Sequence, residues 1–346
     1  MADFLRWIKE DGPRVEGTRD LDRSKVQAPG IVPLPDGGYR LYYTAVGPGR
    51  PSEECQGYIL SAVSDDGLHF QVEPGIRVAP DPDIEHGSLR YLAPTVTQLA
   101  TGRWRMYWES RGASHIPQVV ASAISSDGID WQLEPGPRLQ GFDGVGAPRY
   151  VSLPDGRGRI YCTAAEYDAG GRTSGKRISQ GVISAVTSDG LNFKFEEGYR
   201  MNDGQSEFEA LGITAGDVLP PSSGDEPWRM LYSGWQDAPP GSVIPPHPSD
   251  PNADAAILEE DFAAASIKCD LAGFRSRIFA AHSNDGIHWI RDGIVIEGGG
   301  HDADDIDAVH AEDLSFIRLS DGRYRAYYAC CDRHGKWCVA SAVTAG

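Results

Sequence analysis

Four short stretches of the sequence share one pattern: SDDGLHF at 64–70, SSDGIDW at 125–131, TSDGLNF at 187–193 and SNDGIHW at 283–289. Each contains Asp-Gly, which is typical of tight turns, three residues ahead of an aromatic residue. Successive glycines of the pattern are 61, 62 and 96 residues apart, so the third interval is one period plus an insertion of about 34 residues. A repeat of this length indicates an architecture built from similar supersecondary units.

A hairpin with a second strand rich in Tyr or Trp precedes each of these turns and occurs once more near the C-terminus. The five hairpins begin at Leu34, Ala100, Leu153, Gly224 and Leu319. With its turn, each unit supplies four strands, and four-stranded units arranged around an axis form a β-propeller. Five periods and the insertion account for about 344 of the 346 residues. The sequence therefore predicts an all-β, five-bladed β-propeller that occupies residues 1–346 as a single domain.

The last repeat lacks an outer strand, and the N-terminus contains a matching one. The stretch FLRWIKEDGPRV from Phe4 aligns with IDWQLEPGPRL from Ile129, so that Trp7 corresponds to Trp131. We therefore expect the N-terminal strand to close the last blade and to cover the apolar faces that an open ring would expose.

The insertion falls in the fourth blade, at about 236–274. It begins with a Pro-rich stretch, which disfavours regular structure, and continues as a predicted helix with Asp254 as N-cap and Gly273 just past its end. Because it follows the second strand of its blade, we expect it on the face where the inner strands begin. There it would be either a lid over the channel or a packing element.

The composition narrows the range of partners. Lys and Arg number 32 against 50 Asp and Glu, for a formal net charge of −18, so neither nucleic acid nor a membrane is an expected partner. No stretch resembles a signal peptide or a membrane span, and the six Cys show no paired spacing. We expect a cytoplasmic protein with reduced cysteines that acts on a small molecule.

Charged and aromatic residues gather immediately before the predicted inner strands, which would line a central channel. The candidates are Asp22, Arg23, Glu85, His86, Arg90, Tyr91, Asp143, Arg149, Glu209, Asp217, His310, Glu312 and Asp313. Glu109 and Trp235 follow second strands on the same face. Carboxylates gathered at one mouth repel one another, which raises the pKa of some and permits an acid/base pair. For any single acid in so acidic a chain, the alternative is a solvated loop residue.

The aspartates of the repeated turns have a structural interpretation instead. Asp66, Asp127, Asp189 and Asp285 recur at one place in the repeat, beside a glycine and ahead of an aromatic residue that would pack between blades.

The repeat, the Ala-Pro pairs in the inner strands and the SxDGxxW turns resemble the five-bladed glycosidase superfamily. It includes the arabinanase and xylosidase, the invertase and levanase, and the mannoside phosphorylase families. The resemblance implies Asp and Glu side chains on the funnel, with Glu often directly before a Gly-Pro or Ala-Pro pair. The equivalent positions here are Gln27, Leu92, Gly146, Thr214 and Ala311. None is Glu, so the catalytic residues do not transfer by motif.

The nearest carboxylates give a first hypothesis, a glycoside hydrolase or phosphorylase acting on small glycosides. Asp22 would be the base or nucleophile, Glu209 or Glu312 the acid, and Glu85 would tune their pKa values. A phosphorylase would hold phosphate with Arg90 and Arg149.

Two alternatives stay open beside this hypothesis. One is a lyase, isomerase or cyclase that acts on a small metabolite in the same channel, and the other is a binding propeller without catalysis. No cofactor is required in any of them. The resemblance also allows a central divalent ion, such as calcium, near His310.

Overall fold

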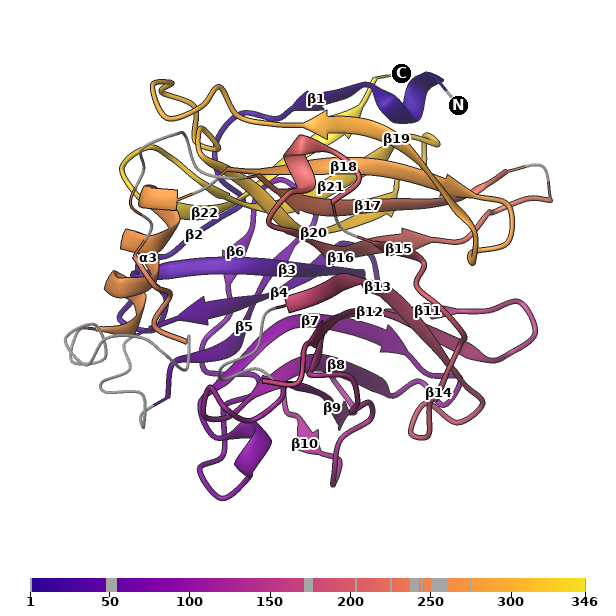
Figure 1. Cartoon of the computed structure of the whole chain (residues 1–346). Helices are drawn as coiled ribbons and strands as arrows, with labels where there is room; N and C mark the ends of the chain where they lie inside the picture. Colours follow the sequence, from indigo (N-terminus) through magenta and orange to yellow (C-terminus); the bar gives the residue numbers. More distant parts are fainter. Residues whose placement is uncertain are drawn as a thin grey trace.

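The computed structural model describes residues 2–47, 55–170, 177–202, 204–224, 226–236, 243, 245–249, 261–273 and 275–345. Over these residues the chain is built almost entirely of antiparallel strands, which fan out around a common centre (Figure 1). Short 3-10 turns lie at Ala2–Leu5 (η1), Glu85–Gly87 (η2) and Glu207–Glu209 (η3).

The described strands group into five antiparallel units. The first contains β3 (Lys25–Pro33), β4 (Tyr39–Val46), β5 (Gly57–Ser64) and β6 (Gln71–Val72). The second contains β7 (Arg90–Gln98), β8 (Trp104–Arg111), β9 (Val119–Ser125) and β10 (Gln132–Leu133). The third contains β11 (Val145–Ser152), β12 (Gly158–Tyr167), β13 (Arg177–Thr187), β14 (Lys194–Phe195) and β15 (Met201–Asn202).

The last two units follow the same plan. The fourth contains β16 (Gly212–Leu219), β17 (Trp228–Trp235), β18 (Ser276–Ser283) and β19 (Trp289–Ile296). The fifth contains β20 (His310–Arg318), β21 (Tyr324–Cys331) and β22 (Trp337–Thr344). Its outer strand comes from the N-terminus: β1 (Trp7–Lys9) and β2 (Val15–Glu16) both pair with β22, as the sequence alignment predicts.

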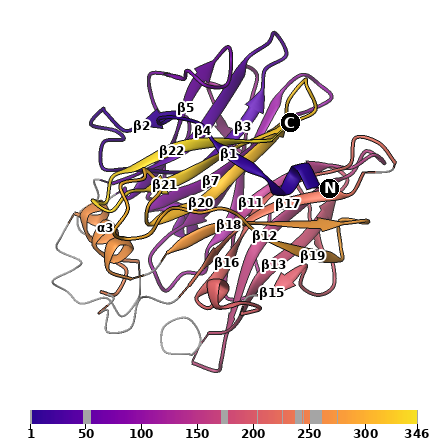
Figure 2. The same ribbon diagram turned by 90° about the horizontal axis from the view of Figure 1, so that it is seen from above.

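The first strands of the units lie side by side around the centre. β3 contacts β7, β7 contacts β11, β11 contacts β16, β16 contacts β20, and β20 contacts β3 again. The hydrogen-bonded strand order does not itself close: single parallel bridges join some neighbouring units, and the strands form sheets of nine, eight and five. Figure 2 shows the units around the centre from a second direction.

The repeated turns hold neighbouring units together. In the first, the Asp66 carboxylate accepts the backbone N–H groups of Leu68 and His69, and Gly67 has a φ of 74°, which favours glycine. Tyr327 of the fifth unit donates its hydroxyl to the carbonyl of Gly67 at 2.9 Å. Equivalent bonds join three further pairs of units: Tyr42 to Gly128, Tyr107 to Gly190 and Tyr161 to Gly286. These contacts confirm the structural interpretation of the turn aspartates.

The inner strands share a bulge near the channel mouth. Ala28, Ala93, Ala147 and Asp313 have φ values of 49°, 52°, 46° and 47°, in the left-handed region that residues other than glycine rarely adopt. Each sits where the pairing of its inner strand with the next strand slips. Three of the four are Ala, so the Asp in the fifth unit is the exception.

The strand pairing corrects one position of the sequence alignment. Glu312 lies opposite Ala329, just as Gln27 lies opposite Thr44 and Leu92 opposite Glu109. Glu312 is therefore the equivalent of Gln27, and the assignment of Ala311 to that place is wrong by one residue. The error arises because no Pro marks the position in the fifth unit.

The insertion contains the helix α3 (Phe262–Gly273), beside the start of β22 in both views. The helix begins after Asp261, whose carboxylate accepts the N–H of Ala264; the predicted cap, Asp254, lies outside the described residues. Ile267 and Leu271 pack against Trp337, which fixes the helix at the channel mouth. In the part of the chain that the structure describes, no helix is long and apolar enough to cross a membrane.

Candidate active site

A cavity of about 250 Å³ lies where the inner strands begin, beneath α3. Four acids and three strong bases line it together with a tryptophan, a histidine and a serine. They are Glu109, Asp270, Glu312, Asp313, Lys25, Arg90, Arg111, Trp235, His247 and Ser266. Of the residues predicted from the sequence, the structure brings Arg90, Trp235, Glu312 and Asp313 together here. Because Ser266 and Asp270 belong to α3, the insertion contributes directly to the cavity wall.

Glu109 is held as an ionised carboxylate. It forms an ion pair with Arg111, and its Oε2 accepts the backbone N–H of Ala147 at 2.9 Å. Burial by itself would raise the pKa of Glu109, but Arg111 and the Ala147 bond outweigh burial and lower it below the ordinary value.

Glu312 and Asp313 are adjacent acids whose environment favours the protonated form. Burial raises the pKa of Glu312, against the effect of the Trp235 indole, which donates to Glu312 Oε2 at 2.7 Å. Burial, and then the neighbouring charge of Glu312, raise the pKa of Asp313 to about 7. Successive residues of a strand normally point to opposite faces, but the bulge at Asp313 allows both side chains to line the cavity.

Lys25 links the first unit to α3 and to the fifth unit. Its ammonium group donates to Asp270 Oδ2 at 2.6 Å and lies 4.2 Å from the centre of the Trp337 ring. The Trp337 indole also donates to Asp270, at 3.1 Å. These contacts hold the helix over the cavity and neutralise both charges.

Arg90 is a buried cation that packs on an aromatic ring and forms no ion pair with a described residue. Its guanidinium lies 4.8 Å from the centre of the Phe262 ring of α3, and its side chain is buried. Burial, followed by repulsion from Arg111, lowers the pKa of Arg90 to about 9.

Arg149 lies at the centre of the molecule and separates this cavity from the opposite mouth. Its guanidinium donates to backbone carbonyls of four inner strands: Pro29, Ala93, Pro148 and Leu314, at 2.9–3.5 Å. Asp217, another predicted site residue, lines a separate hollow of about 370 Å³ on the far side. Its carboxylate accepts bonds from the Ser315 hydroxyl and the Phe316 N–H.

Two of the predicted catalytic acids have contacts that stabilise loops. Asp22 is buried and accepts bonds from the Arg19 guanidinium at 2.7 Å and the Tyr43 hydroxyl at 3.0 Å. Glu209 is buried in the same way, against the Tyr232 hydroxyl at 2.8 Å and Arg291 at 3.1 Å. Neither lines the cavity.

The same arrangement recurs in the fifth unit, where Asp307 accepts bonds from Tyr328 and Lys9. The acid, tyrosine and base thus form a repeated structural contact before the inner strand.

The other predicted residues lie around the cavity and do not line it. Glu85 and Arg23 are exposed, and Arg23 pairs with Asp20. The His86 carbonyl accepts a bond from Ser110, and Asp143 accepts the N–H of Tyr167. Tyr91 packs against Trp108, with ring centres 5.0 Å apart.

His310 is buried against Trp337, and burial lowers its pKa to about 4. Among the described residues, no group of three or more His, Cys, Asp or Glu side chains could hold a metal ion. The central position is also occupied by the cationic Arg149, whose guanidinium takes the carbonyl oxygens that a calcium ion would need. The described residues therefore do not fit a central calcium ion.

One cavity residue that is absent from the predicted catalytic acids, Glu109, is recognisable when the repeats are compared position by position. Glu109 takes the place of Thr44, Thr163 and Ser233 in three of the other units and of Ala329 in the fifth. A carboxylate where the other units carry a hydroxyl group or an alanine is a signal present in the sequence. By contrast, Lys25, Arg111, His247 and Asp270 have no such signal.

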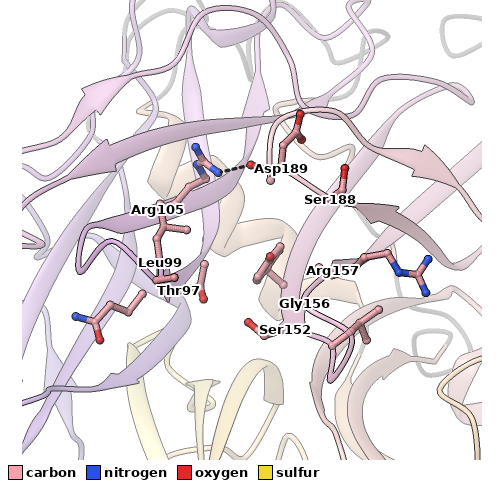
Figure 3. Close-up of a pocket in the computed structure, with 14 residues that line it drawn as sticks. Thr97, Leu99, Arg105, Ser152, Gly156, Arg157, Ser188 and Asp189 are labelled. Atoms are coloured by element: carbon pink, nitrogen blue, oxygen red, sulfur yellow. Dashed lines mark hydrogen bonds between the residues drawn. The ribbon is translucent and has the colours of Figure 1, made fainter.

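A third hollow, of about 310 Å³, lies between the second and third units (Figure 3). Arg105 lines it and donates to the Asp189 carbonyl at 3.1 Å, which is one of the contacts between a unit and the turn of the next. No described carboxylate with a raised pKa lines it.

No protein-family model matches the sequence, and neither does any curated protein. Solved structures of glycoside hydrolases, however, resemble the chain along nearly its whole length. A glycosyl hydrolase from Bacteroides ovatus superposes with a TM-score of 0.66 at 16% identity, over 97% of this chain and 93% of that chain. A thermostable family-43 glycoside hydrolase gives 0.64 at 13% identity, over 96% and 91%.

A third similar structure concerns the GH130 family of mannoside phosphorylases, which contains glycoside hydrolases that target β-1,2 mannosidic linkages in Candida mannan. It gives a TM-score of 0.64 at 16% identity, over 98% of this chain and 94% of that chain. At these identities the likeness shows the fold. The chain has the all-β propeller fold of these glycoside hydrolases, as the resemblance of its repeats indicates.

Proposed function

We propose that the chain is one five-bladed propeller over residues 1–346, with its insertion at about 236–274, and that it is a carbohydrate-active enzyme. Its reaction would be cleavage of a glycosidic bond in the cavity beneath α3. The cyclic contacts of the five inner strands and the N-terminal strand in the fifth unit support the blade count. The glycoside hydrolases that share the fold support the class of activity.

One observation carries the proposal: the cavity contains carboxyl groups whose pKa values are pushed apart. The pKa of Glu109 is lowered, whereas that of Asp313 is raised to about 7, and both line the same space. Glycoside cleavage requires one protonated and one ionised carboxyl group on either side of the bond. Glu312, beside Asp313, maintains the high proton affinity of its neighbour.

In this proposal Asp313 donates its proton to the glycosidic oxygen as that oxygen leaves. Glu109 acts at the anomeric carbon, either by removing a proton from the attacking water or by attacking directly. Trp235 holds Glu312 in place. These roles replace Asp22 and Glu209, whose carboxylates are engaged by Tyr and Arg side chains outside the cavity.

The test is an incubation of the full chain with arabino-, xylo-, fructo- and manno-oligosaccharides and with glycosides of uronic acids. Each is run with and without phosphate, and released sugar is measured. We expect cleavage of at least one glycoside, and a requirement for phosphate would identify a phosphorylase. No release from any substrate by folded protein would refute the proposal.

A second candidate function is a lyase, isomerase or cyclase reaction on a small metabolite. It is favoured by the size of the cavity, about 250 Å³. Pockets for drug-sized ligands are roughly 300–1,000 Å³, so this cavity suits a ligand of about one ring. In that case a small ligand would bind in the cavity and no glycoside would be cleaved.

A further inference from the structure

Arg90 is a buried guanidinium that forms no ion pair with a described residue; the charge of Glu109 favours its protonated form, but Glu109 is itself paired with Arg111. The residue is 4% exposed, and its Nε has no hydrogen-bond acceptor. The neighbouring cations are satisfied: Lys25 is paired with Asp270, and Arg111 with Glu109. A buried charge without a partner is costly, so proteins keep one mainly where something else pairs with it.

The fold makes room for this side chain. β5 meets β7 at the pair Gly57 and Arg90, and a Cβ on Gly57 would lie 2.8 Å from the Arg90 Cγ. The absence of a side chain at Gly57 therefore lets the aliphatic stem of Arg90 pass. At its other end the guanidinium is covered by the Phe262 ring of α3, and it faces the cavity together with Glu109 and Asp313.

The charges around the cavity favour an anion with a single negative charge. The Lys25–Asp270 and Arg111–Glu109 pairs cancel, which leaves Arg90 as the cation of the cavity that forms no ion pair with a described residue. A guanidinium presents two parallel N–H groups that match the two oxygens of a carboxylate. A phosphate dianion would bring a second negative charge close to Glu312 and Asp313.

We propose that Arg90 forms an anion-binding subsite and that the substrate is a sugar bearing a carboxylate, such as a uronic acid glycoside. The inference rests on the proposed function for its site, and it adds the chemical class of the substrate. The carboxylate would form a two-point ion pair with Arg90, while Phe262 supports the opposite side of the guanidinium.

The experiment measures binding of glucuronate, galacturonate, glucose, galactose and inorganic phosphate by calorimetry. Wild type is compared with Arg90→Gln, Arg90→Lys and the exposed control Arg23→Gln. We expect each uronate to bind wild type at least tenfold more tightly than its neutral counterpart. Arg90→Gln would abolish that preference, Arg90→Lys would keep part of it, and Arg23→Gln would leave it unchanged.

A thermal melt of the ligand-free proteins separates an anion subsite from a structural role. Removal of an unpaired buried charge is expected to raise the melting temperature in Arg90→Gln, whereas loss of a structural residue would lower it. Equal binding of uronates and neutral sugars, or tighter binding of phosphate than of either uronate, would overturn the assignment.

The binding experiment and the glycoside-cleavage test can fail independently of each other. Uronate binding that depends on Arg90, without cleavage of any glycoside, would refute the proposed reaction and leave the subsite standing. Cleavage of neutral glycosides by a protein without preference for uronates would support the proposed reaction and refute the anion-binding subsite.

Discussion

The carboxylate of Glu109 accepts the backbone N–H of Ala147 at 2.9 Å, across the boundary between two units of the fold. Thr44 makes the same contact with the N–H of Ala93 at 3.1 Å, and Ser233 makes it with that of Asp313 at 2.9 Å. A hydroxyl group is therefore sufficient to hold the bulge of the next inner strand. The negative charge at position 109 exceeds what the fold requires and points to a role in chemistry.

The repeat itself supplies the variant that tests this role. Glu109→Thr places at this position the residue that the first unit carries, so the contact with the Ala147 N–H is retained. We expect a folded protein with a lower melting temperature, because Arg111 loses the carboxylate with which it is paired, and a loss of turnover of about 100-fold or more, since the ionised carboxyl group is gone. Kinetics on the substrate found in the glycoside panel provide the measurement.

Glu85→Gln is the matched control for Glu109→Thr, because Glu85 is an exposed acid outside the cavity. Its turnover should equal that of wild type. A Glu109→Thr enzyme as active as this control would exclude Glu109 from the reaction.

Asp313→Asn tests the proton donor. Asn tolerates the left-handed backbone conformation that Asp313 adopts, so the bulge should persist. The amide cannot donate a proton as a carboxylic acid does, and we expect kcat to fall by about 100-fold or more on substrates with poor leaving groups. Substrates with activated aryl leaving groups should lose much less. An equal loss on both kinds of substrate would assign proton donation elsewhere.

The raised pKa of Asp313 also predicts how activity depends on pH. The donor must be protonated, so kcat/KM should fall as the pH rises through about 7, and this limb should disappear in Asp313→Asn. A limb that persists unchanged in the variant would contradict the assignment.

The free energy of unfolding should also depend on the protonation of Asp313. A carboxyl group with a raised pKa in the folded state stabilises the fold at low pH, and that contribution is lost as the pH rises from its unfolded pKa of about 3.9 to about 7. The free energy of unfolding of wild type, relative to Asp313→Asn, should therefore decrease between pH 4 and pH 7 and level off above it. Urea titrations of both proteins across this range make the comparison, and a relative stability that rises with pH would be inconsistent with it.

Asp22→Asn separates a structural acid from a catalytic one. The carboxylate accepts charged and neutral hydrogen bonds from Arg19 and Tyr43, so the variant should lose about 2 kcal/mol of stability. Because Asp22 does not line the cavity, kcat at a temperature well below the melt should stay within about twofold of wild type. Urea unfolding and kinetics on the same preparation check both parts, and a large loss of kcat would restore the role that the sequence alone favours.

Most of the fold could be predicted from the repeats, because each turn has the same local hydrogen bonds and packing. The Ser or Thr, the Asp and the Gly of each turn bond within the turn, and its aromatic residue packs on the Tyr of a neighbouring unit, as Trp131 does on Tyr42 at 5.9 Å. Such interactions are short-range in sequence or periodic, so the pattern of residues reveals them.

The site was harder to predict because its members come from irregular positions. Glu109 ends a second strand, Asp313 occupies a bulge, and Asp270 lies on an insertion without a counterpart in the other units. Asp22 and Glu209 lie in the right region of the sequence but point into loop contacts. Which acids share a cavity depends on side-chain direction, and a one-residue shift in strand register changes that direction.

Arg149 has a consequence for the direction in which a substrate travels. By bridging the carbonyls of four inner strands, it ends the cavity partway along the axis. For an enzyme of the proposed kind, a polymer cannot thread from one face to the other, and product must leave by the entrance.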